Sequence, residues 1–175
     1  MLMLIAGLVL FLGVHSSRVF ADDARSAFIA AHGEKTWKSL YAVLSIVGFV
    51  LMVYGYGEAR TVPLVLWTPP LWTRHAAALL TLPAFILLAA AYVPRNAIKA
   101  RLGHPMLLGT KLWAAAHLLA NGNVADVLLF GGFLVWAILC FRAAKSRDRA
   151  AGIVYRSAGA TPTVIAIAAV SYTHL

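Results

Sequence analysis

The sequence predicts an all-α fold: a polytopic membrane helix bundle with five complete transmembrane helices and a truncated sixth. Hydrophobic residues make up 62% of the 175 residues and charged residues only 12%, whereas a soluble domain has roughly 45–50% apolar and about 25% charged residues. The apolar residues form runs of about the length that crosses a bilayer, 17–25 residues. The basic residues lie in the gaps between these runs, which is typical of a multi-pass membrane protein.

The complete runs cover residues 2–20, 40–57, 76–93, 105–121 and 124–141. A sixth run begins at Thr163 and reaches only residue 175, which is too short to cross a bilayer. Its polar ending, residues 171–175, breaks the apolar pattern. We therefore interpret residues 1–175 as a single transmembrane domain with a truncated C-terminus, native to about Ala169, and assign no role to His174.

The basic residues predict the orientation. The connections 21–39, 94–104 and 142–162 carry 3, 3 and 5 Lys or Arg residues, whereas the opposite side holds only Arg60 and Arg74. Because cytoplasmic loops collect Lys and Arg, we expect these three connections to be cytoplasmic and the N-terminus to lie outside. Aromatic residues expected near the outer boundary are Tyr54, Tyr56, Trp67 and Trp72.

A cleaved signal peptide is the alternative interpretation of the first run. Residues 19–21 resemble a small-residue cleavage site after an apolar core. Two features disfavour this interpretation: no Lys or Arg precedes the core, and Arg18 stands directly before the cut.

Several classes of function are excluded by composition and by missing motifs. The net charge of +9 is spread over loops rather than forming the basic stripe of a nucleic-acid-binding domain. The nucleotide-binding, zincin, hydrolase and CxxC signatures are absent from the sequence. A single cysteine, Cys140, excludes an internal disulfide. With only six acidic residues, a carboxylate metal site is hard to build, so histidine remains the candidate chemical group.

Two histidines lie inside apolar runs, His15 in the first and His117 in the fourth. Ionisable groups in a membrane span are costly and often functional, although each could also be a buried histidine hydrogen-bonded between helices. At 100° per residue His117 shares a face with Thr110 and Ala114. Two neutral imidazoles that face each other across a helix bundle can ligate haem iron, so His15 and His117 are candidates for such a pair.

Other ionisable residues are weaker candidates. His75 and His104 stand at the starts of the third and fourth runs, where a histidine commonly completes a helix start at the interface. Lys111 lies about 9 Å into the fourth helix; it either extends to the inner surface or pairs with a substrate carboxylate or haem propionate. Arg18 is expected to extend to the inner surface near Asp22.

Three motifs carry a resemblance to a known family. They are FLGVHSSR near the start, HPMLLGTKLWAAAHLLANG in the fourth run and DVLLFGGFLVWA directly after it. The sequence resembles the NnrU family of bacterial integral membrane proteins, which is related to the 15-cis-zeta-carotene isomerase of plants and cyanobacteria. The resemblance extends from residue 2 to about Ala169 and implies the bacterial cytoplasmic membrane as the location.

The resemblance implies an association with denitrification and nitric oxide metabolism. The isomerase branch uses haem b, and its two ligand motifs match His15 and His117 here. That branch has a cysteine three residues before the second histidine, whereas this chain has Ala114. Polyene isomerisation is therefore the less favoured implication.

Depth in the membrane gives a different pairing. His15 lies roughly 8 Å from the inner edge and His117 roughly 6 Å from the outer edge, so their Cα atoms differ in depth by roughly 15 Å. A bis-histidine haem needs about 12–13 Å between those atoms, and the pair therefore requires tilted helices or shifted boundaries. Depth alone pairs His117 with His75 and His15 with His104. His75 and His104 are therefore our second choice of ligands, after His15 and His117.

Three functions follow from these observations. The first is a haem-b-binding membrane protein of nitric oxide metabolism, as a redox protein or an isomerase. The second is a non-enzymatic membrane component that assembles the respiratory or nitric oxide reductase machinery and docks through the basic segment 142–156. A transporter is less favoured, because no inverted repeat or pair of broken helices is visible. Whether the chain is an enzyme stays open, and the partners expected are membrane lipid and that machinery, without nucleic acid.

Overall fold

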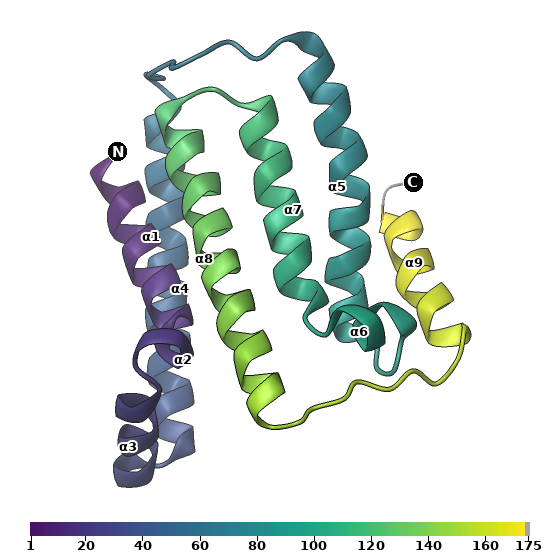
Figure 1. Cartoon of the computed structure of the whole chain (residues 1–175). Coiled ribbons are helices and arrows are strands. Elements are labelled where there is room, and N and C mark those ends of the chain that lie inside the picture. The colour runs from purple at the N-terminus through teal and green to yellow at the C-terminus, as the bar shows by residue number, and fades with distance from the viewer. Residues whose placement is uncertain (174–175) are drawn as a thin grey trace. The chain divides into compact units, whose positions relative to one another are not determined.

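The computed structural model describes the backbone of residues 1–173 and the side chains of residues 1–170. Over this range the secondary structure is helical apart from one isolated bridge between Val65 and Asn123, so the prediction of an all-α fold is confirmed. The helices, drawn in Figure 1, are α1 (Leu2–His15), α2 (Ser17–Phe20), α3 (Asp22–His32), α4 (Glu34–Ala59), α5 (Leu71–Tyr92), α6 (Ala97–Leu102), α7 (Pro105–Ala120), α8 (Val124–Ala150) and α9 (Thr161–Thr173).

Three of the described helices, α4, α5 and α8, are long and apolar enough to cross a membrane. α1 and the described apolar part of α9 are shorter, and α7 has 16 residues. The first apolar run does not form one helix, because α1 ends at His15 and the separate turn α2 follows. At this junction the Ser16 hydroxyl donates to the Leu12 carbonyl at 2.6 Å. Such a side-chain bond offers the backbone an alternative to the regular helix ladder.

Two segments expected as loops are partly helical. Residues 21–39 contain α3 and the first turn of α4, and α8 continues to Ala150 rather than ending near residue 141. Charged side chains allow helix to extend beyond the apolar run: Lys38 Nζ lies 2.9 Å from Glu34 Oε1, one helical turn away. α4 and α8 are therefore longer than the apolar runs they contain.

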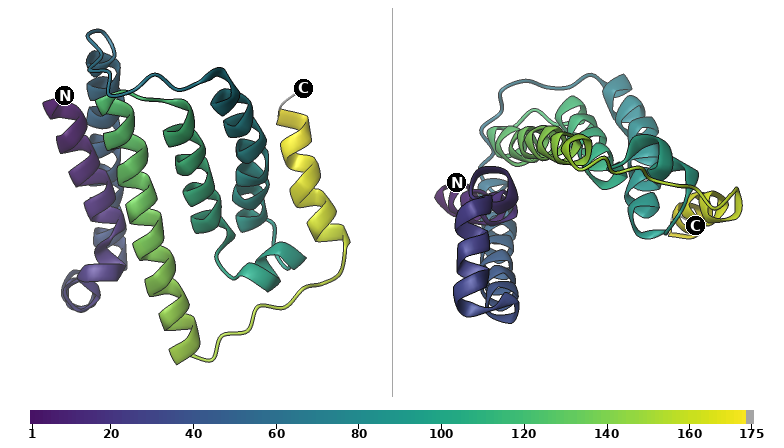
Figure 2. Two further views of the ribbon diagram at one scale, coloured as in Figure 1. Left: turned by 45° about the horizontal axis from the view of Figure 1, so that its top comes forward. Right: turned by 60° about the horizontal axis from the view of Figure 1, so that its bottom comes forward.

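The chain forms two compact units. Unit 1 comprises Met1–Trp67 and Gly122–Gly132, and in it α1 lies beside α4 along its length (Figures 1 and 2). The contact is close because glycines line it: a Cβ at Gly7 would collide with the backbone of Met52, and one at Gly55 with Leu4. Small residues permit this backbone approach between helices in a membrane.

A polar cluster closes one end of unit 1. Asp126, on the first turn of α8, is 2% exposed and accepts a hydrogen bond from the Tyr56 hydroxyl of α4 at 2.5 Å. Asn123, directly before α8, donates its side-chain amide to the other Asp126 oxygen at 3.0 Å. The Leu66 amide donates to the Gly122 carbonyl at 2.8 Å, so the segment before α5 is held against the start of α8.

Unit 2 comprises Thr68–Asn121 and Phe133–Leu175, and its centre is the pair α5 and α7. A Cβ at Gly109 of α7 would lie 2.8 Å from the Ala84 carbonyl oxygen, so these helices also approach closely. The turn between α5 and α6 depends on the fully buried Asn96. Its amide donates to the carbonyls of Ala90 and Val93, and its oxygen accepts from the Lys99 amide at the start of α6.

Candidate functional site

His15 is the last residue of α1 and is half-buried. Its Nδ1 atom lies 2.7 Å from the carbonyl oxygen of Phe11. A carbonyl oxygen only accepts hydrogen bonds, so Nδ1 is the donor, and in the neutral imidazole the lone pair is then on Nε2. This is the tautomer that a histidine needs in order to bind a metal through Nε2.

Aromatic residues hold the His15 ring. The ring stacks on Phe11 of the same helix, with centroids 4.2 Å apart and planes at 29°. Tyr41 of α4 approaches from the partner helix, with its centroid 5.1 Å from that of His15. The ring orientation is thus set by α1 and by the α1–α4 contact together.

His32 repeats the local arrangement in α3. Its Nδ1 lies 3.3 Å from the Phe28 carbonyl oxygen, and its ring stacks on Phe28 at 4.5 Å. His32 is exposed, however, whereas His15 is half-buried. The hydrogen bond to the residue four positions earlier is therefore ordinary helix geometry, and the surroundings of His15 are what distinguish it.

His117 lies near the end of α7 and is half-buried. Its ring meets Trp113 edge-on at 5.1 Å. Its carbonyl oxygen accepts from both the backbone amide and the side-chain amide of Asn121, at 3.0 and 2.8 Å, and these bonds end the helix. The neighbouring Ala114 is fully buried, in agreement with the small-residue face expected from the sequence.

The predicted pair is divided between the units, with His15 in unit 1 and His117 in unit 2. The pairing of the two imidazoles stays a prediction. Among the described residues, no three His, Cys, Asp or Glu side chains group as they would around a metal ion.

The second-choice histidines stand at opposite ends of unit 2. His75, near the start of α5, is exposed. His104, directly before α7, is one-fifth exposed, and its Nε2 atom lies 2.8 Å from Oδ2 of Asp148 near the end of α8. The two atoms are at ion-pair distance without the alignment of a hydrogen bond. His104 is thus engaged by a carboxylate.

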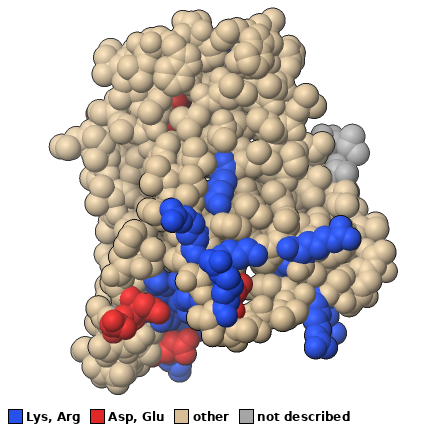
Figure 3. All heavy atoms as spheres, viewed as in Figure 1, with Lys and Arg blue, Asp and Glu red and all other residues tan. Residues whose placement is uncertain are grey.

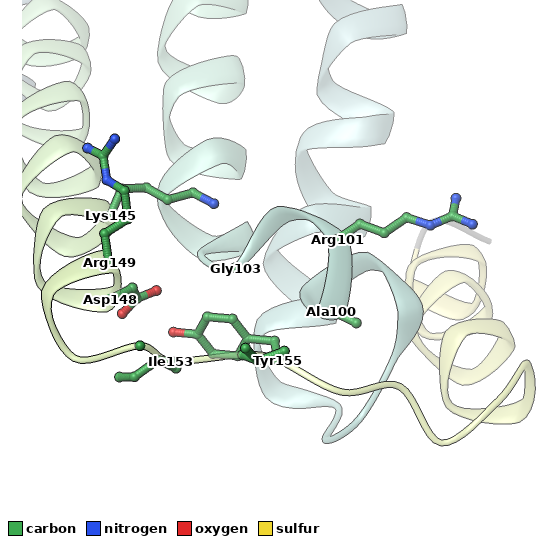
Figure 4. A pocket seen from close by; sticks show the side chains of 10 residues that line it. Ala100, Arg101, Gly103, Lys145, Asp148, Arg149, Ile153 and Tyr155 are labelled. Carbon is green, nitrogen blue, oxygen red and sulfur yellow. The ribbon is translucent and has the colours of Figure 1, made fainter.

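Tyr155 completes this arrangement. Its ring meets that of His104 edge-on at 5.9 Å, and its hydroxyl faces the Asp148 carboxylate (Figure 4). Desolvation, together with the hydrogen bond to Asp148 and its negative charge, raises the pKa of Tyr155. Asp148 and Tyr155 were not predicted from the sequence, although Asp148 is the one acidic residue in the strongly basic segment 142–162.

The two basic candidates have local partners. Arg18 Nε lies 3.9 Å from Asp22 Oδ1, one turn further along the chain. Lys111 Nζ lies 3.7 Å from the centroid of the Phe141 ring in α8, which is a cation–π contact. The charge of Lys111 is therefore stabilised by an aromatic face within unit 2.

Basic side chains gather at one end of unit 2. They lie on α6, on the last turns of α8 and on the segment that follows, where Figure 3 shows blue surface. From the sequence we expect these segments on one side of the membrane. Within unit 2 the fold brings them to the same end, because α5 and α8 both terminate there (Figure 1).

Apolar helices of membrane-crossing length that end in basic segments define an α-helical integral membrane protein. Its candidate site consists of half-buried histidines at helix ends. The model of the family described as NnrU protein matches residues 3–175, and the chain belongs to this family. Searches of curated proteins and of solved structures gave no match.

Proposed function

We propose that this chain is a haem-b-binding protein of the bacterial cytoplasmic membrane that takes part in nitric oxide metabolism, with His15 and His117 as the axial ligands. The observation that carries the proposal is the setting of His15: its ring is half-buried at the end of α1, is held between Phe11 and Tyr41, and has its Nδ1 atom 2.7 Å from the Phe11 carbonyl oxygen. Metal-binding histidines usually donate their other ring N–H to a carbonyl or carboxylate, which fixes the tautomer and the ring direction. Membership of the NnrU family supports the physiological context.

The residues fit such a group. His15 is a neutral-imidazole donor whose ring is held by Phe11 and Tyr41. His117 is half-buried near the end of α7, and its ring lies edge-on to Trp113 at 5.1 Å. When bound, haem b would supply an iron for redox or ligand-exchange chemistry. The protein's own residues would position the two imidazoles and keep water away from them.

The proposal includes a topology. α4, α5 and α8 cross the membrane, and we add the α1–α2 segment and α7 as the remaining two crossings, with α9 as part of a sixth. α7 is about 24 Å long at 1.5 Å per residue, which suits a crossing that bends or thins the bilayer around it. The N-terminus lies outside, because the basic segments between helices collect on the other side.

Absorbance of the purified full-length chain tests haem binding. We expect a Soret band after expression with haem supply, and its loss in His15→Ala and in His117→Ala. His32→Ala is the matched control, since His32 has the same local hydrogen bond and Phe stacking on an exposed helix. Wild-type protein without a Soret band would contradict the proposal, and so would a band that survives in both ligand variants.

A second candidate function is a non-enzymatic assembly component. The observation that favours it is the basic end of unit 2, where Arg142, Lys145 and Arg149 line one depression. Such a surface suits an acidic partner protein. Co-purification of the respiratory or nitric oxide reductase machinery tests this function. Charge reversal at these three positions should abolish the co-purification and leave haem binding intact.

A further inference from the structure

Three basic residues form a stripe along the end of α8. Arg142, Lys145 and Arg149 are spaced by three and four residues, which places them within about 60° of one another around the helix. Together with Phe141 and Ser146 they line a depression of about 750 Å³. Like charges at this spacing repel one another. Among the described residues no carboxylate lies within ion-pair distance of any of the three.

The nearest acid in sequence, Asp148, is turned to other partners. His104 Nε2 lies 2.8 Å from it, and the Tyr155 hydroxyl faces it from the other side (Figure 4). Asp148 also lines a cavity with Lys145 and Arg149, but it forms no ion pair with any of the three cations. The stripe therefore keeps its net positive charge.

The stripe lies at the depth of lipid headgroups. α8 has 27 residues and is about 40 Å long, whereas about 20 residues cross the hydrocarbon core of about 30 Å. Counted from Val124, the helix leaves the core near residue 143. Arg142, Lys145 and Arg149 are thus placed where an α-helix meets phosphate groups.

Apolar side chains stand beside the stripe. After α8 the chain reverses at Gly152, whose φ of 62° suits glycine, and the Ile153 amide donates to the Asp148 carbonyl at 2.9 Å. This turn leaves Ile153 51% exposed and Val154 79% exposed. Both line a second cavity of about 370 Å³ together with Lys145 and Arg149. In Figure 4 Lys145 extends from α8 toward Gly103.

We infer that the basic stripe of α8 binds the phosphate of an anionic phospholipid. A free phosphate ion could use the same cations, but the stripe begins where α8 leaves the hydrocarbon core, at the level of the lipid headgroups, and this position favours a lipid. A cavity of this size is within the range of about 300–1000 Å³ that small-molecule sites occupy. This inference does not depend on haem binding.

Native mass spectrometry of the full-length protein, released from nanodiscs of mixed phosphatidylglycerol and phosphatidylcholine, tests the inference. We expect the wild type to retain phosphatidylglycerol selectively. Retention should fall about tenfold or more in R142Q/K145Q/R149Q, since each cation near an anionic leaflet contributes to binding. R25Q/K35Q/K38Q removes the same charge from unit 1 and should leave retention unchanged. R142K/R149K keeps the charge and should retain the lipid.

Three outcomes would overturn the inference: equal retention of the two lipids by the wild type, undiminished retention in the triple variant, or an equal loss in the unit 1 variant. A further arm adds glycerol phosphate in solution at the same phosphate concentration. Displacement of the lipid by this soluble anion would assign the site to free phosphate groups instead. Should the triple variant fold poorly, as judged by circular dichroism, K145Q alone tests the same prediction, because Lys145 lines both cavities.

Discussion

The Nε2 atom of His104 lies 2.8 Å from the Oδ2 atom of Asp148, and this contact ties the residue before α7 to the end of α8. The side chains are 20% and 14% exposed, so water screens the pair only in part. Tyr155 stands beside both. The three residues hold together the helix ends that present the basic stripe of α8.

Loss of Asp148 should destabilise unit 2. In Asp148→Asn the Tyr155 hydroxyl keeps an acceptor, but His104 faces an amide instead of a carboxylate. We expect a cost of about 1–3 kcal/mol, measured by thermal unfolding in detergent. Glu34→Gln, which removes an exposed surface pair with Lys38, is the control and should leave the unfolding midpoint nearly unchanged. An equal effect of the two substitutions would contradict this role of Asp148.

Alkaline pH should weaken the same region. Because the pKa of Tyr155 is raised in the folded protein, the fold favours the neutral phenol. Its contribution to stability is complete below the ordinary tyrosine pKa of about 10 and is lost as pH rises through the folded value. The difference in stability between wild type and Tyr155→Phe, followed from pH 8 to pH 12, should therefore shrink above about pH 10. A difference that stays constant across this range would contradict the assignment.

The buried carboxylate of unit 1 gives a third prediction. Tyr56→Phe removes the hydroxyl that donates to Asp126 at 2.5 Å, while Asn123 remains as the other donor. The loss of one hydrogen-bond donor to a buried carboxylate should lower the free energy of unfolding by about 1–3 kcal/mol. Tyr54→Phe, on the exposed side of α4, is the matched control and should be neutral. The measurement is the thermal unfolding midpoint of the two variants, which should be lower for Tyr56→Phe than for Tyr54→Phe. Equal midpoints would contradict the prediction.

Helix contact in unit 1 should depend on particular glycines. Gly55→Ala places a methyl group against the backbone of Leu4, whereas Gly13→Ala places it in open space. We expect the first variant to lose about 1–3 kcal/mol through strain and the second to be unaffected. Crosslinking between cysteines placed on α1 and α4 reports whether the helices remain adjacent. Efficient crosslinking and unchanged stability in Gly55→Ala would contradict the close contact.

Much of the fold could be predicted because the bilayer imposes length and polarity on each crossing. The apolar runs located α4, α5, α7 and α8 and the all-α class. They did not locate the end of α1, because the hydropathy of a segment carries no information about a single side-chain hydrogen bond such as that of Ser16. They also missed the helical extension of α8, since charged residues continue a helix in water as readily as they end a membrane span.

The candidate site could be predicted only in part. Histidine within an apolar run indicated His15 and His117, and resemblance to the NnrU family supported the same two residues. The contact of His104 with Asp148 could not be foreseen, because it joins positions far apart in the sequence and depends on how α7 and α8 end. The sharing of Asp126 between Tyr56 and Asn123 was missed for the same reason.

The central claim is that the imidazoles of His15 and His117 bind one haem iron between them. Electron paramagnetic resonance of the oxidised, purified protein tests it most directly, together with the haem-to-protein ratio. The account predicts one haem per chain with the low-spin signal of two histidine ligands, and a change to high spin or loss of haem in either His15→Ala or His117→Ala but not in His32→Ala. A low-spin bis-histidine signal that persists in His15→Ala and in His117→Ala would contradict it.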